Sequence, residues 1–175
     1  MSDAPQESPP PIPRHQIARE IAKRFAYLRR VVIVEMGRVL APLGATVPLY
    51  HVLFRLGTAE GPLGQQELTL DAGLDAAGVS RLLARMVREK LVVVRTDPTD
   101  RRRRLVRLTP KGRALEESLS PLVDAAVRNM VSGLEEGEER LLLSMLDRAV
   151  VATMRTEGER RRRRRRARGE PPPTG

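Results

Sequence analysis

Arginine and lysine side chains crowd into one stretch of this chain, between Arg81 and Lys111. The stretch holds eleven basic residues against three acidic ones, which gives it a net charge of +8. Side chains at this charge density favour binding to nucleic-acid phosphates, because each neutralised phosphate releases a condensed counterion. The chemistry predicted for this stretch is therefore phosphate binding.

A helix must present the first of these side chains. Residues 76–90 have helical spacing, with an apolar set at i, i+3, i+4 and i+7 that begins at Val79. The opposite face interleaves small residues with arginines, so it could enter a DNA groove closely and reach base acceptors. We predict DNA contacts for Ala77, Ser80, Arg81, Ala84, Arg85 and Arg88. Arg81 and Arg85 are the candidates for base edges, and the alternative is an ordinary solvated helix face.

A hairpin follows this helix. Valine-rich residues 91–95 and residues 105–108 predict two strands, and Asp97-Pro98-Thr99-Asp100 between them is turn chemistry. We expect the tip to project toward a DNA backbone and to contact it through Asp100, Arg101, Arg102, Arg103 and Arg104. Two alternatives stay open: Asp100 as an ordinary turn cap, and the arginines as surface charge.

The flanking residues predict a helix-turn-helix. One helix begins near Pro48 and ends at Gly57, the next spans about 65–72, and Asp75 is a suitable N-cap for the helix over 76–90. Thr109 and Pro110 then begin a helix to about residue 131. A last helix is predicted over about 135–156.

A long first helix is predicted over about 14–41. Its apolar residues recur every three or four positions for about seven turns, more than a small domain needs for its own core. Packing against a second copy explains this stripe better than a monomer core does. The predicted dimer interface comprises Ile17, Ile21, Phe25, Leu28, Leu142, Met145 and Leu146.

Aromatic residues are scarce, with two Tyr, two Phe and no Trp. This scarcity argues against single-strand binding by base stacking. Four rings on the first two helices could line a ligand pocket: Tyr27, Tyr50, His51 and Phe54. The competing interpretation is that they are ordinary core and boundary residues.

Composition changes sharply at both ends of the chain. Residues 1–13 are rich in proline, and residues 157–175 combine arginine with proline, so both are predicted to be disordered tails. The second tail carries +5, but the body between the tails keeps +7. Its arginine run could be a non-specific DNA tether or a solvated tail, and it consists of Arg160, Arg161, Arg162, Arg163, Arg164, Arg165 and Arg166.

Several classes of protein are disfavoured by composition. The chain has no Cys and two His, which argues against thiol redox sensing, zinc sites and any metal or other cofactor. No Gly-rich phosphate loop or catalytic constellation supports an enzyme. The first residues do not read as a signal peptide, and no apolar run could span a bilayer, so we expect a cytoplasmic, nucleoid-associated protein without membrane contact.

With these elements in this order, the chain resembles the MarR family of bacterial transcriptional regulators. The matches are L-D-A-A-G-V-S-R-L in the helix-turn-helix and D-P-T-D-R-R-R-R-L-V-R-L-T-P-K-G in the wing. The family's Asp-x-Arg wing signature falls on Asp100 and Arg102, and Leu108-Thr109 and Lys111-Gly112 follow it. The resemblance covers residues 14–156.

This resemblance implies a mainly α fold with a small β-hairpin wing: a winged helix-turn-helix over about 48–109, flanked by dimerisation helices over about 14–41, 110–131 and 135–156. It implies a homodimer on a pseudo-palindromic duplex, usually a repressor released by a small, often aromatic ligand. It also implies that Asp100 pairs with Arg102 and orients it into the minor groove.

The chain departs from the family pattern at two places. Ala77 and Gly78 stand where the family commonly has Ser or Thr, and Lys90 stands where the family favours Gly before the wing. The missing hydroxyls and the arginine tail lend weight to an alternative function, a constitutive architectural DNA binder with little sequence preference. A sequence-specific, ligand-responsive repressor is the preferred hypothesis.

Overall fold

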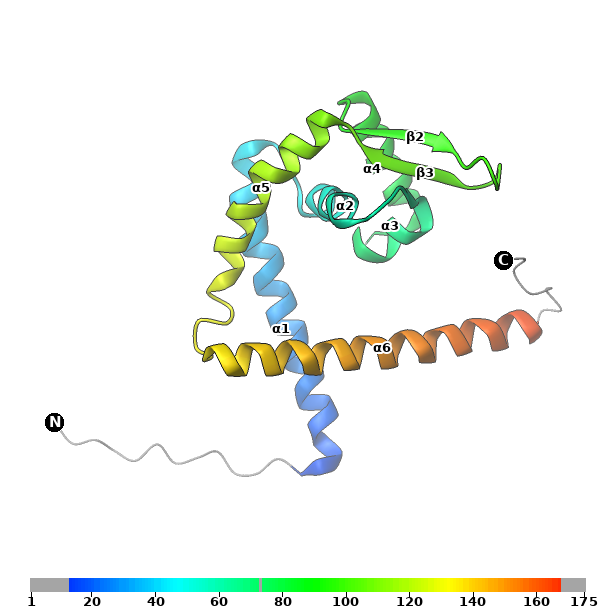
Figure 1. Ribbon diagram of the computed structural model, residues 1–175. Helices are drawn as coiled ribbons and strands as arrows, with labels where there is room; N and C mark the ends of the chain where they lie inside the picture. The colour runs from blue at the N-terminus through cyan, green and yellow to red at the C-terminus, as the bar shows by residue number, and fades with distance from the viewer. Residues whose placement is uncertain (1–12, 73, 168–175) are drawn as a thin grey trace. The chain divides into compact units, whose positions relative to one another are not determined.

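The computed structural model describes residues 13–72 and 74–167 (Figure 1). They form a mainly helical fold with one small antiparallel sheet, as predicted. The chain divides into two compact units, one ending at Met130 and the other beginning at Val131. Within the described residues no single helix is long and apolar enough to cross a bilayer; only His15–Leu43 and Val47–Thr58 taken together, with a 90° bend between them, reach that length and composition.

The first two helices begin and end close to where the sequence places them. Helix α1 spans Arg14–Leu40 and continues as a 3-10 turn over Ala41–Leu43. The turn ends at Gly44, whose φ of 68° lies in the left-handed region that favours glycine. Helix α2 spans Val47–Thr58, and the hydroxyl of Thr46 caps it by accepting from a backbone N–H of its first turn.

The helix-turn-helix follows a very short strand. Strand β1 is Leu63–Gly64, helix α3 is Gln65–Ala72 and helix α4 is Ala76–Arg88. Asp75 is the N-cap of α4, as predicted, because its carboxylate accepts from the backbone N–H of Gly78 at 2.6 Å. Helix α3 packs against both α2 and α4, which sets the position of α4.

The wing is a hairpin of β2 (Val92–Thr96) and β3 (Arg104–Leu108), with sheet order β1-β3-β2. Its register pairs Val92 with Leu108 and Thr96 with Arg104. The prediction that Arg104 lies at the hairpin tip is therefore wrong by one residue, because Arg104 is already paired in the ladder. The tip consists of residues 97–103.

The last two helices end at other residues than predicted. Helix α5 spans Pro110–Arg128, three residues shorter than expected at its end. Helix α6 spans Glu136–Ala167, so residues 157–167 are helical where we predicted a disordered tail. Arginine has a high helix propensity, and the next strong helix breakers after the run are Gly169 and the prolines from Pro171. The remaining parts of both predicted tails, 1–12 and 168–175, lie outside the described residues.

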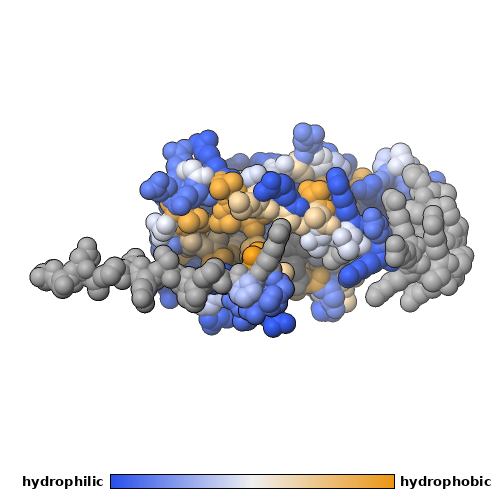
Figure 2. Space-filling model, turned by 90° about the horizontal axis from the view of Figure 1, so that it is seen from below, coloured by the Kyte–Doolittle hydropathy of each residue, from blue (hydrophilic) through white to orange (hydrophobic). Residues whose placement is uncertain are grey.

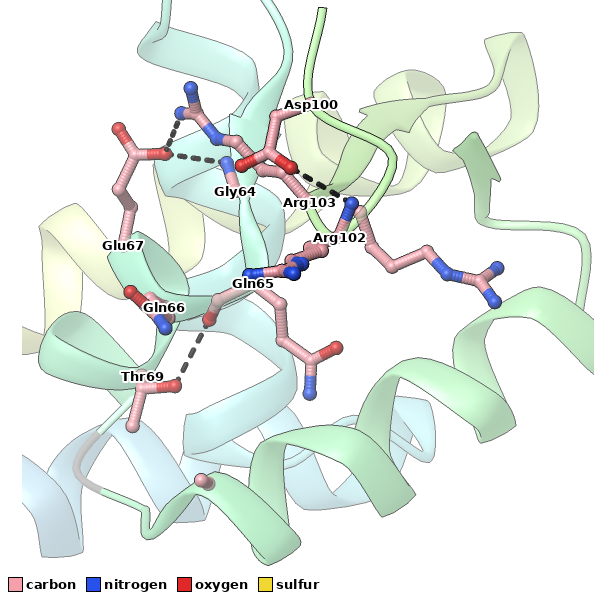
Figure 3. Close-up of a pocket in the computed structure, with 10 residues that line it drawn as sticks. Gly64, Gln65, Gln66, Glu67, Thr69, Asp100, Arg102 and Arg103 are labelled. Atoms are coloured by element: carbon pink, nitrogen blue, oxygen red, sulfur yellow. Dashed lines mark hydrogen bonds and ion pairs between the residues drawn. The ribbon is translucent and has the colours of Figure 1, made fainter. Parts of the chain in front are cut away.

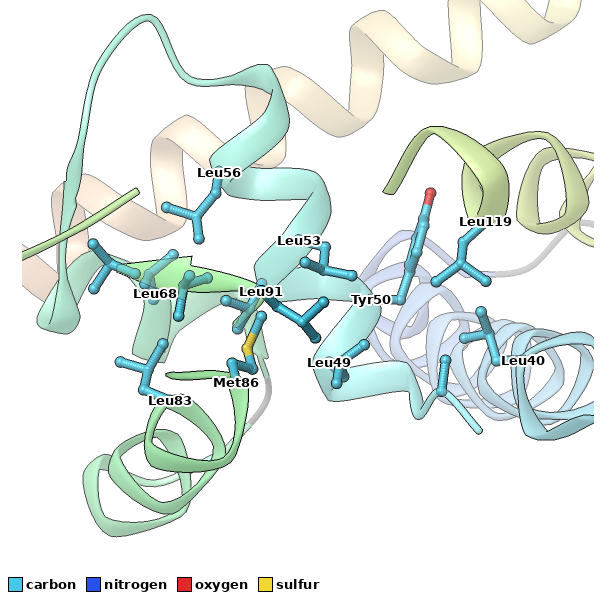
Figure 4. Close-up of a cluster of buried hydrophobic side chains, with 14 of the residues drawn as sticks. Leu40, Leu49, Tyr50, Leu53, Leu56, Leu68, Leu83, Met86, Leu91 and Leu119 are labelled. Atoms are coloured by element: carbon cyan, nitrogen blue, oxygen red, sulfur yellow. The ribbon is translucent and has the colours of Figure 1, made fainter. Parts of the chain in front are cut away.

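The hydrophobic core of the first unit lies where α1, α2, α3, α4, α5 and the sheet converge (Figure 4). Leu40 of α1, Leu53 of α2 and Leu119 of α5 are fully buried there. Leu68 of α3 and Met86 of α4 complete the part of the core beneath the helix-turn-helix. The face of α4 that was predicted to be buried therefore packs into this core.

The base of the wing is closed by contacts between the start of α5 and the backbone after α4. Thr109 caps α5 by accepting from the N–H of Gly112 at 3.0 Å, and its own N–H donates to the carbonyl of Leu91 at 3.0 Å. The Thr109 hydroxyl also lies 2.7 Å from the carbonyl oxygen of Lys90, to which it donates. The ammonium of Lys111 donates to the carbonyl of Glu89 at 3.0 Å.

Gly112 makes this closure possible. A Cβ atom added there would lie 2.0 Å from the carbonyl oxygen of Leu91, which belongs to the backbone and cannot rotate away. Only a residue without a side chain lets the first turn of α5 lie on the end of α4. This contact explains the Lys111-Gly112 pair on which the family resemblance partly depends.

Lys90 adopts the conformation that a glycine would favour. Its φ is 59°, so it is the left-handed residue after α4. The N–H of Leu91 donates to Met86 O at 2.8 Å and that of Lys90 to Val87 O at 3.0 Å, which is the Schellman arrangement. The departure from glycine at Lys90 therefore does not change the geometry of the helix end, which is kept with lysine in a strained position.

Replacing Gly112 with alanine should destabilise the fold by about 3 kcal/mol, because the new methyl group overlaps a backbone carbonyl. The free energy of unfolding in urea is the measurement. Gly133→Ala is the control, since a Cβ at Gly133 meets nothing within 4 Å. Equal stability of the two variants would show that α5 can move away from Leu91 without cost.

Replacing Lys90 with glycine should stabilise the fold by about 0.5–1 kcal/mol, because relief of left-handed strain exceeds the extra chain entropy of glycine. The same urea titration measures it. Lys90→Ala removes the same side chain but keeps the strain, so its stability should stay within about 0.5 kcal/mol of the native chain. If both variants are equally stabilising, the side chain and not the backbone is the cause.

Candidate nucleic-acid interface

The outer face of α4 has the composition that was expected of a groove-entering helix. Ala77, Ser80, Arg81, Ala84 and Arg88 are all exposed. No ion pair joins Arg81 or Arg88 to another residue in the described part of the chain. Both guanidinium groups are thus available to an external anion.

Arg85 lies in a different environment from its neighbours. Its Nε donates to a carboxylate oxygen of Glu89 at 2.7 Å, and one terminal nitrogen donates to the carbonyl of Gly44 at 3.4 Å. Its side chain is 40% exposed. Arg85 therefore joins α4 to the turn between α1 and α2, and a base contact would require it to leave or share Glu89.

Gly78 has a structural reason to occupy the start of α4. A Cβ atom there would lie 2.9 Å from the capping oxygen of Asp75 and 3.2 Å from Leu74. The close N-cap of α4 therefore uses the space that a hydroxyl-bearing side chain would need. Sequence reasoning noted the missing hydroxyl but not the contact that explains it.

In the wing tip, Asp100 caps the turn and does not pair with the Arg102 guanidinium. Its carboxylate accepts from the backbone N–H of Arg102 at 2.9 Å, and its carbonyl accepts from the N–H of Arg103 at 2.9 Å. The expected Asp100–Arg102 ion pair is absent from the described residues, so the turn-cap alternative is the correct one. The Arg102 side chain extends away from the carboxylate (Figure 3).

The ion pairs of the wing involve Arg103, which was expected to contact phosphate. One of its terminal nitrogens lies 2.8 Å from a carboxylate oxygen of Glu67 on α3, and the other lies 3.9 Å from Asp97. The same Glu67 oxygen accepts from the N–H of Gly64 at 2.6 Å. Sequence reasoning missed Glu67 and Asp97; the capping-box spacing of Glu67 after Gly64 was the only local signal.

Both carboxylates are held in the ionised form. The pKa of Glu67 is lowered chiefly by the hydrogen bond from Gly64, and Arg103 lowers it further. The pKa of Asp97 is lowered chiefly by the hydroxyl and the backbone N–H of Thr99, which both donate to it. Both acids are therefore negatively charged at neutral pH within the basic surface.

A cleft of about 560 Å³ lies between the wing tip, α3 and the start of α4 (Figure 3). Its polar lining includes Gln65, Gln66, Arg102 and Arg104. The amide and guanidinium groups on two sides of the cleft are donors of the kind that hydrogen-bond phosphate oxygens, and the carboxylates of Glu67 and Asp100 lie in the same lining. The cleft thus links the wing to the helix-turn-helix as one basic surface.

The four rings suggested as a ligand pocket do not share one environment. Tyr50 is a core residue with 4% exposure, and its hydroxyl lies 3.2 Å from that of Ser120 on α5. It stacks on Phe54, with ring centroids 5.9 Å apart, and lies 6.3 Å from the ring of His51. Tyr27 is 59% exposed, with the Arg30 guanidinium over its ring. Burial raises the pKa of Tyr50.

The apolar stripe of α1 divides into two halves. Met36 and Leu40 are buried in the core, and this part of α1 packs against α5 and α2. Toward the start of the helix, Ile17, Ile21 and Phe25 are each more than 40% exposed, and Leu28 is half-buried. The stripe is therefore part of the core near the end of α1 and exposed near its start.

Helix α6 also exposes apolar side chains. Leu142 and Met145 are 37% and 47% exposed, and Leu146 is half-buried. Leu143 and Met154 are more exposed still. Figure 2 shows apolar side chains among charged ones on the face seen from below. Exposed large apolar side chains that form a contiguous patch are typical of protein interfaces.

A sequence profile of the MarR family matches residues 43–103, which include α2, α3, α4 and the wing tip. The chain is 30% identical over 90 residues to the HTH-type transcriptional repressor NicR of Pseudomonas putida, a match that covers 51% of this chain and 57% of that protein. It is 33% identical over 86 residues to the HTH-type transcriptional regulator YdgJ of Bacillus subtilis, covering 49% and 52%. The chain thus spans little more than half the length of the curated relatives it matches.

A solved structure extends the similarity beyond the winged helix. CouR from Rhodococcus jostii RHA1, bound to p-coumaroyl-CoA, has a TM-score of 0.65 and 26% identity. The comparison covers 74% of this chain and 90% of that one. The likeness therefore includes elements outside residues 43–103.

Proposed function

We propose that the chain, whose residues 43–103 match the profile of the MarR family, is a winged helix-turn-helix member of that family and a sequence-specific, double-stranded DNA-binding regulator of transcription, specifically a repressor. The observation that carries the proposal is the exposed arginine and alanine face of α4 beside the arginine-rich wing. Two neighbouring basic elements suit a helix in the major groove and a hairpin in the adjacent minor groove. The similarity to the repressor NicR supports repression of transcription over activation.

The proposed contacts differ in kind. Arg81 is the principal candidate for a base edge, with Arg85 joining it once it leaves Glu89. Ala77, Ser80 and Ala84 would let the helix approach, and Arg88 would bind a phosphate. In the wing, Arg101, Arg102 and Arg104 would bind the backbone or the minor groove, with Asp100 holding the turn.

We further propose that two copies bind one pseudo-palindromic operator through paired half-sites. The uncovered part of the α1 stripe and the apolar residues of α6 support this assembly. Burying the remaining exposed surface of Ile17, Ile21 and Phe25 would contribute about 1 kcal/mol each, since each side chain is already more than half buried. A dimer of this kind would reside with the nucleoid as long as it is bound to DNA.

A small-molecule effector is proposed to release the DNA. CouR, which is solved with an aromatic acyl-CoA bound, supports an aromatic effector for this chain. The residues proposed to contact it are Tyr27, Tyr50, His51 and Phe54. Since Tyr50 is buried and bonded to Ser120, binding there would have to move α2 relative to α5.

The arginine run at the end of α6 supports a second candidate function, that of an architectural DNA binder. Residues 160–166 would add a sequence-independent phosphate contact, and each phosphate neutralised steepens the dependence of log K on log salt by about 0.9. If this run dominated binding, the protein would act as a constitutive architectural DNA binder. In the preferred proposal the run is only a tether.

The two functions separate in one titration. The chain is bound to a duplex from the region upstream of its own gene and to a scrambled duplex of equal length, at two salt concentrations. A regulator should prefer the first duplex by about 10³ or more at both salts. Equal affinities that fall together with salt would establish the architectural binder and reject the repressor.

Arg81→Ala should weaken operator binding by about 1–3 kcal/mol and relax base preference at one position in each half-site. Arg128→Ala is the control, because it removes the same charge from an exposed site at the end of α5. Base preference is measured by titrating single-substitution operators. If Arg81→Ala weakens all duplexes equally, the residue binds phosphate and not a base edge.

Ile21→Glu should convert the dimer into a folded monomer, because the interface would bury an unpaired carboxylate. Sedimentation at about 10 µM should show the dissociation constant raised by about 100-fold or more. Arg19→Glu, on the opposite face of the same helix, should leave the dimer intact. A native chain that sediments as a monomer would end the dimer proposal.

A further inference from the structure

Among the wing arginines, Arg103 differs from its neighbours because its guanidinium group pairs with carboxylates of the same chain. We propose that Arg103 is a positioning residue that fixes the wing tip to α3 through Glu67, and that it does not itself bind DNA. This inference rests on the proposed function, since the pose of the wing matters there for binding to a duplex. It divides the arginine run into one residue paired with the chain's own carboxylates and three that are proposed to contact DNA.

The contacts form a connected latch between segments far apart in sequence. Glu67 and Arg103 are separated by 36 positions, yet their charged atoms lie 2.8 Å apart. The Glu67 oxygen in this pair also accepts the 2.6 Å hydrogen bond from Gly64. Asp97, whose side chain is only 9% exposed, faces the same guanidinium from within the wing at 3.9 Å. Arg103 therefore lies between a carboxylate on α3 and one in the hairpin; its contact with Glu67 is drawn in Figure 3.

The backbone beneath this pair leaves room for it. A Cβ atom at Gly64 would lie 2.8 Å from the paired oxygen of Glu67 and 3.0 Å from Nε of Arg103. Gly64 has no positive φ, so its small size and not its backbone freedom is what the site uses. The ion pair thus lies directly on Gly64, and a Cβ atom there would force the paired side-chain ends to shift.

The wing needs such a latch because its sheet gives the tip little support. Strand β1 has two residues and pairs only with Val106 and Leu105 of β3. A two-stranded hairpin is marginally stable by itself, and residues 97–103 lie beyond its ladder. Fixing the tip in advance lowers the entropy lost when it binds DNA. The latch also fixes the tip relative to α4, because α3 packs on α4.

A charge-neutral variant tests positioning directly. Gly64→Ala should push Glu67 and Arg103 apart while the chain keeps every charge, and Gly61→Ala is the control because a Cβ there meets nothing within 4 Å. Without DNA, hydrogen exchange of amides 97–104 should become about three- to fivefold faster in Gly64→Ala only. Identical exchange in the two variants would overturn the latch.

A double-mutant cycle with Glu67→Gln and Arg103→Gln tests whether Arg103 touches DNA. Glutamine at position 67 keeps an acceptor for the N–H of Gly64 but loses the charge that holds Arg103. Arg103→Gln should weaken binding to the upstream duplex about three- to fivefold in the native chain and have no further effect in Glu67→Gln. An equal loss in both backgrounds would mean that Arg103 binds DNA itself.

Arg102→Gln is the matched control in this cycle. It should weaken binding by the same factor in the native chain and in the Glu67→Gln background, and it should reduce the salt slope by about 0.9 in both. Arg103→Gln should leave that slope unchanged. If the chain shows no preference for the upstream duplex, the proposed function fails, but the hydrogen-exchange comparison still decides whether the latch exists.

Discussion

The close approach of Gly112 to the carbonyl of Leu91 is the constraint on which the rest of the basic surface depends. It places the start of α5 on the end of α4, and Thr109 and Lys111 then satisfy the carbonyl groups that α4 leaves open. The hairpin leaves and returns at this junction, so its direction relative to α4 is set there. Even the strained Lys90 is tolerated, because the helix end it makes lets the chain turn from α4 into β2.

Carboxylates divide the arginines of this surface into two groups. Glu67 and Asp97 hold Arg103, and Glu89 holds Arg85. Each pair is partly exposed, so its net contribution to stability is about 1 kcal/mol or less. Their larger effect is on geometry, since they give two long side chains one preferred direction. Arg81, Arg88 and Arg102, by contrast, keep their charge available for a polyanion.

The apolar surface of the chain is uneven in a way that fits an assembly. The buried residues gather beneath the helix-turn-helix and against α5, whereas exposed Ile, Phe, Leu and Met side chains lie on the first half of α1 and along α6. An isolated helix gains little stability from propensity alone and needs a packed apolar face. A second copy of the chain would provide that face and would also fix the spacing between two recognition helices.

Local sequence determined much of this protein. The periodicity of α1, the caps Thr46, Asp75 and Thr109, and the turn chemistry between β2 and β3 each depend on a few neighbouring residues, and the predicted elements follow them closely. Only the tertiary structure decided the partners of the charged groups. Asp100 bonds locally, to a backbone N–H two residues away, whereas Arg103 pairs with a carboxylate 36 positions away, because that ion pair forms between groups that folding brings together. The need for glycine at 112 has the same origin, since it lies under a backbone carbonyl from a distant segment and no local pattern records that contact.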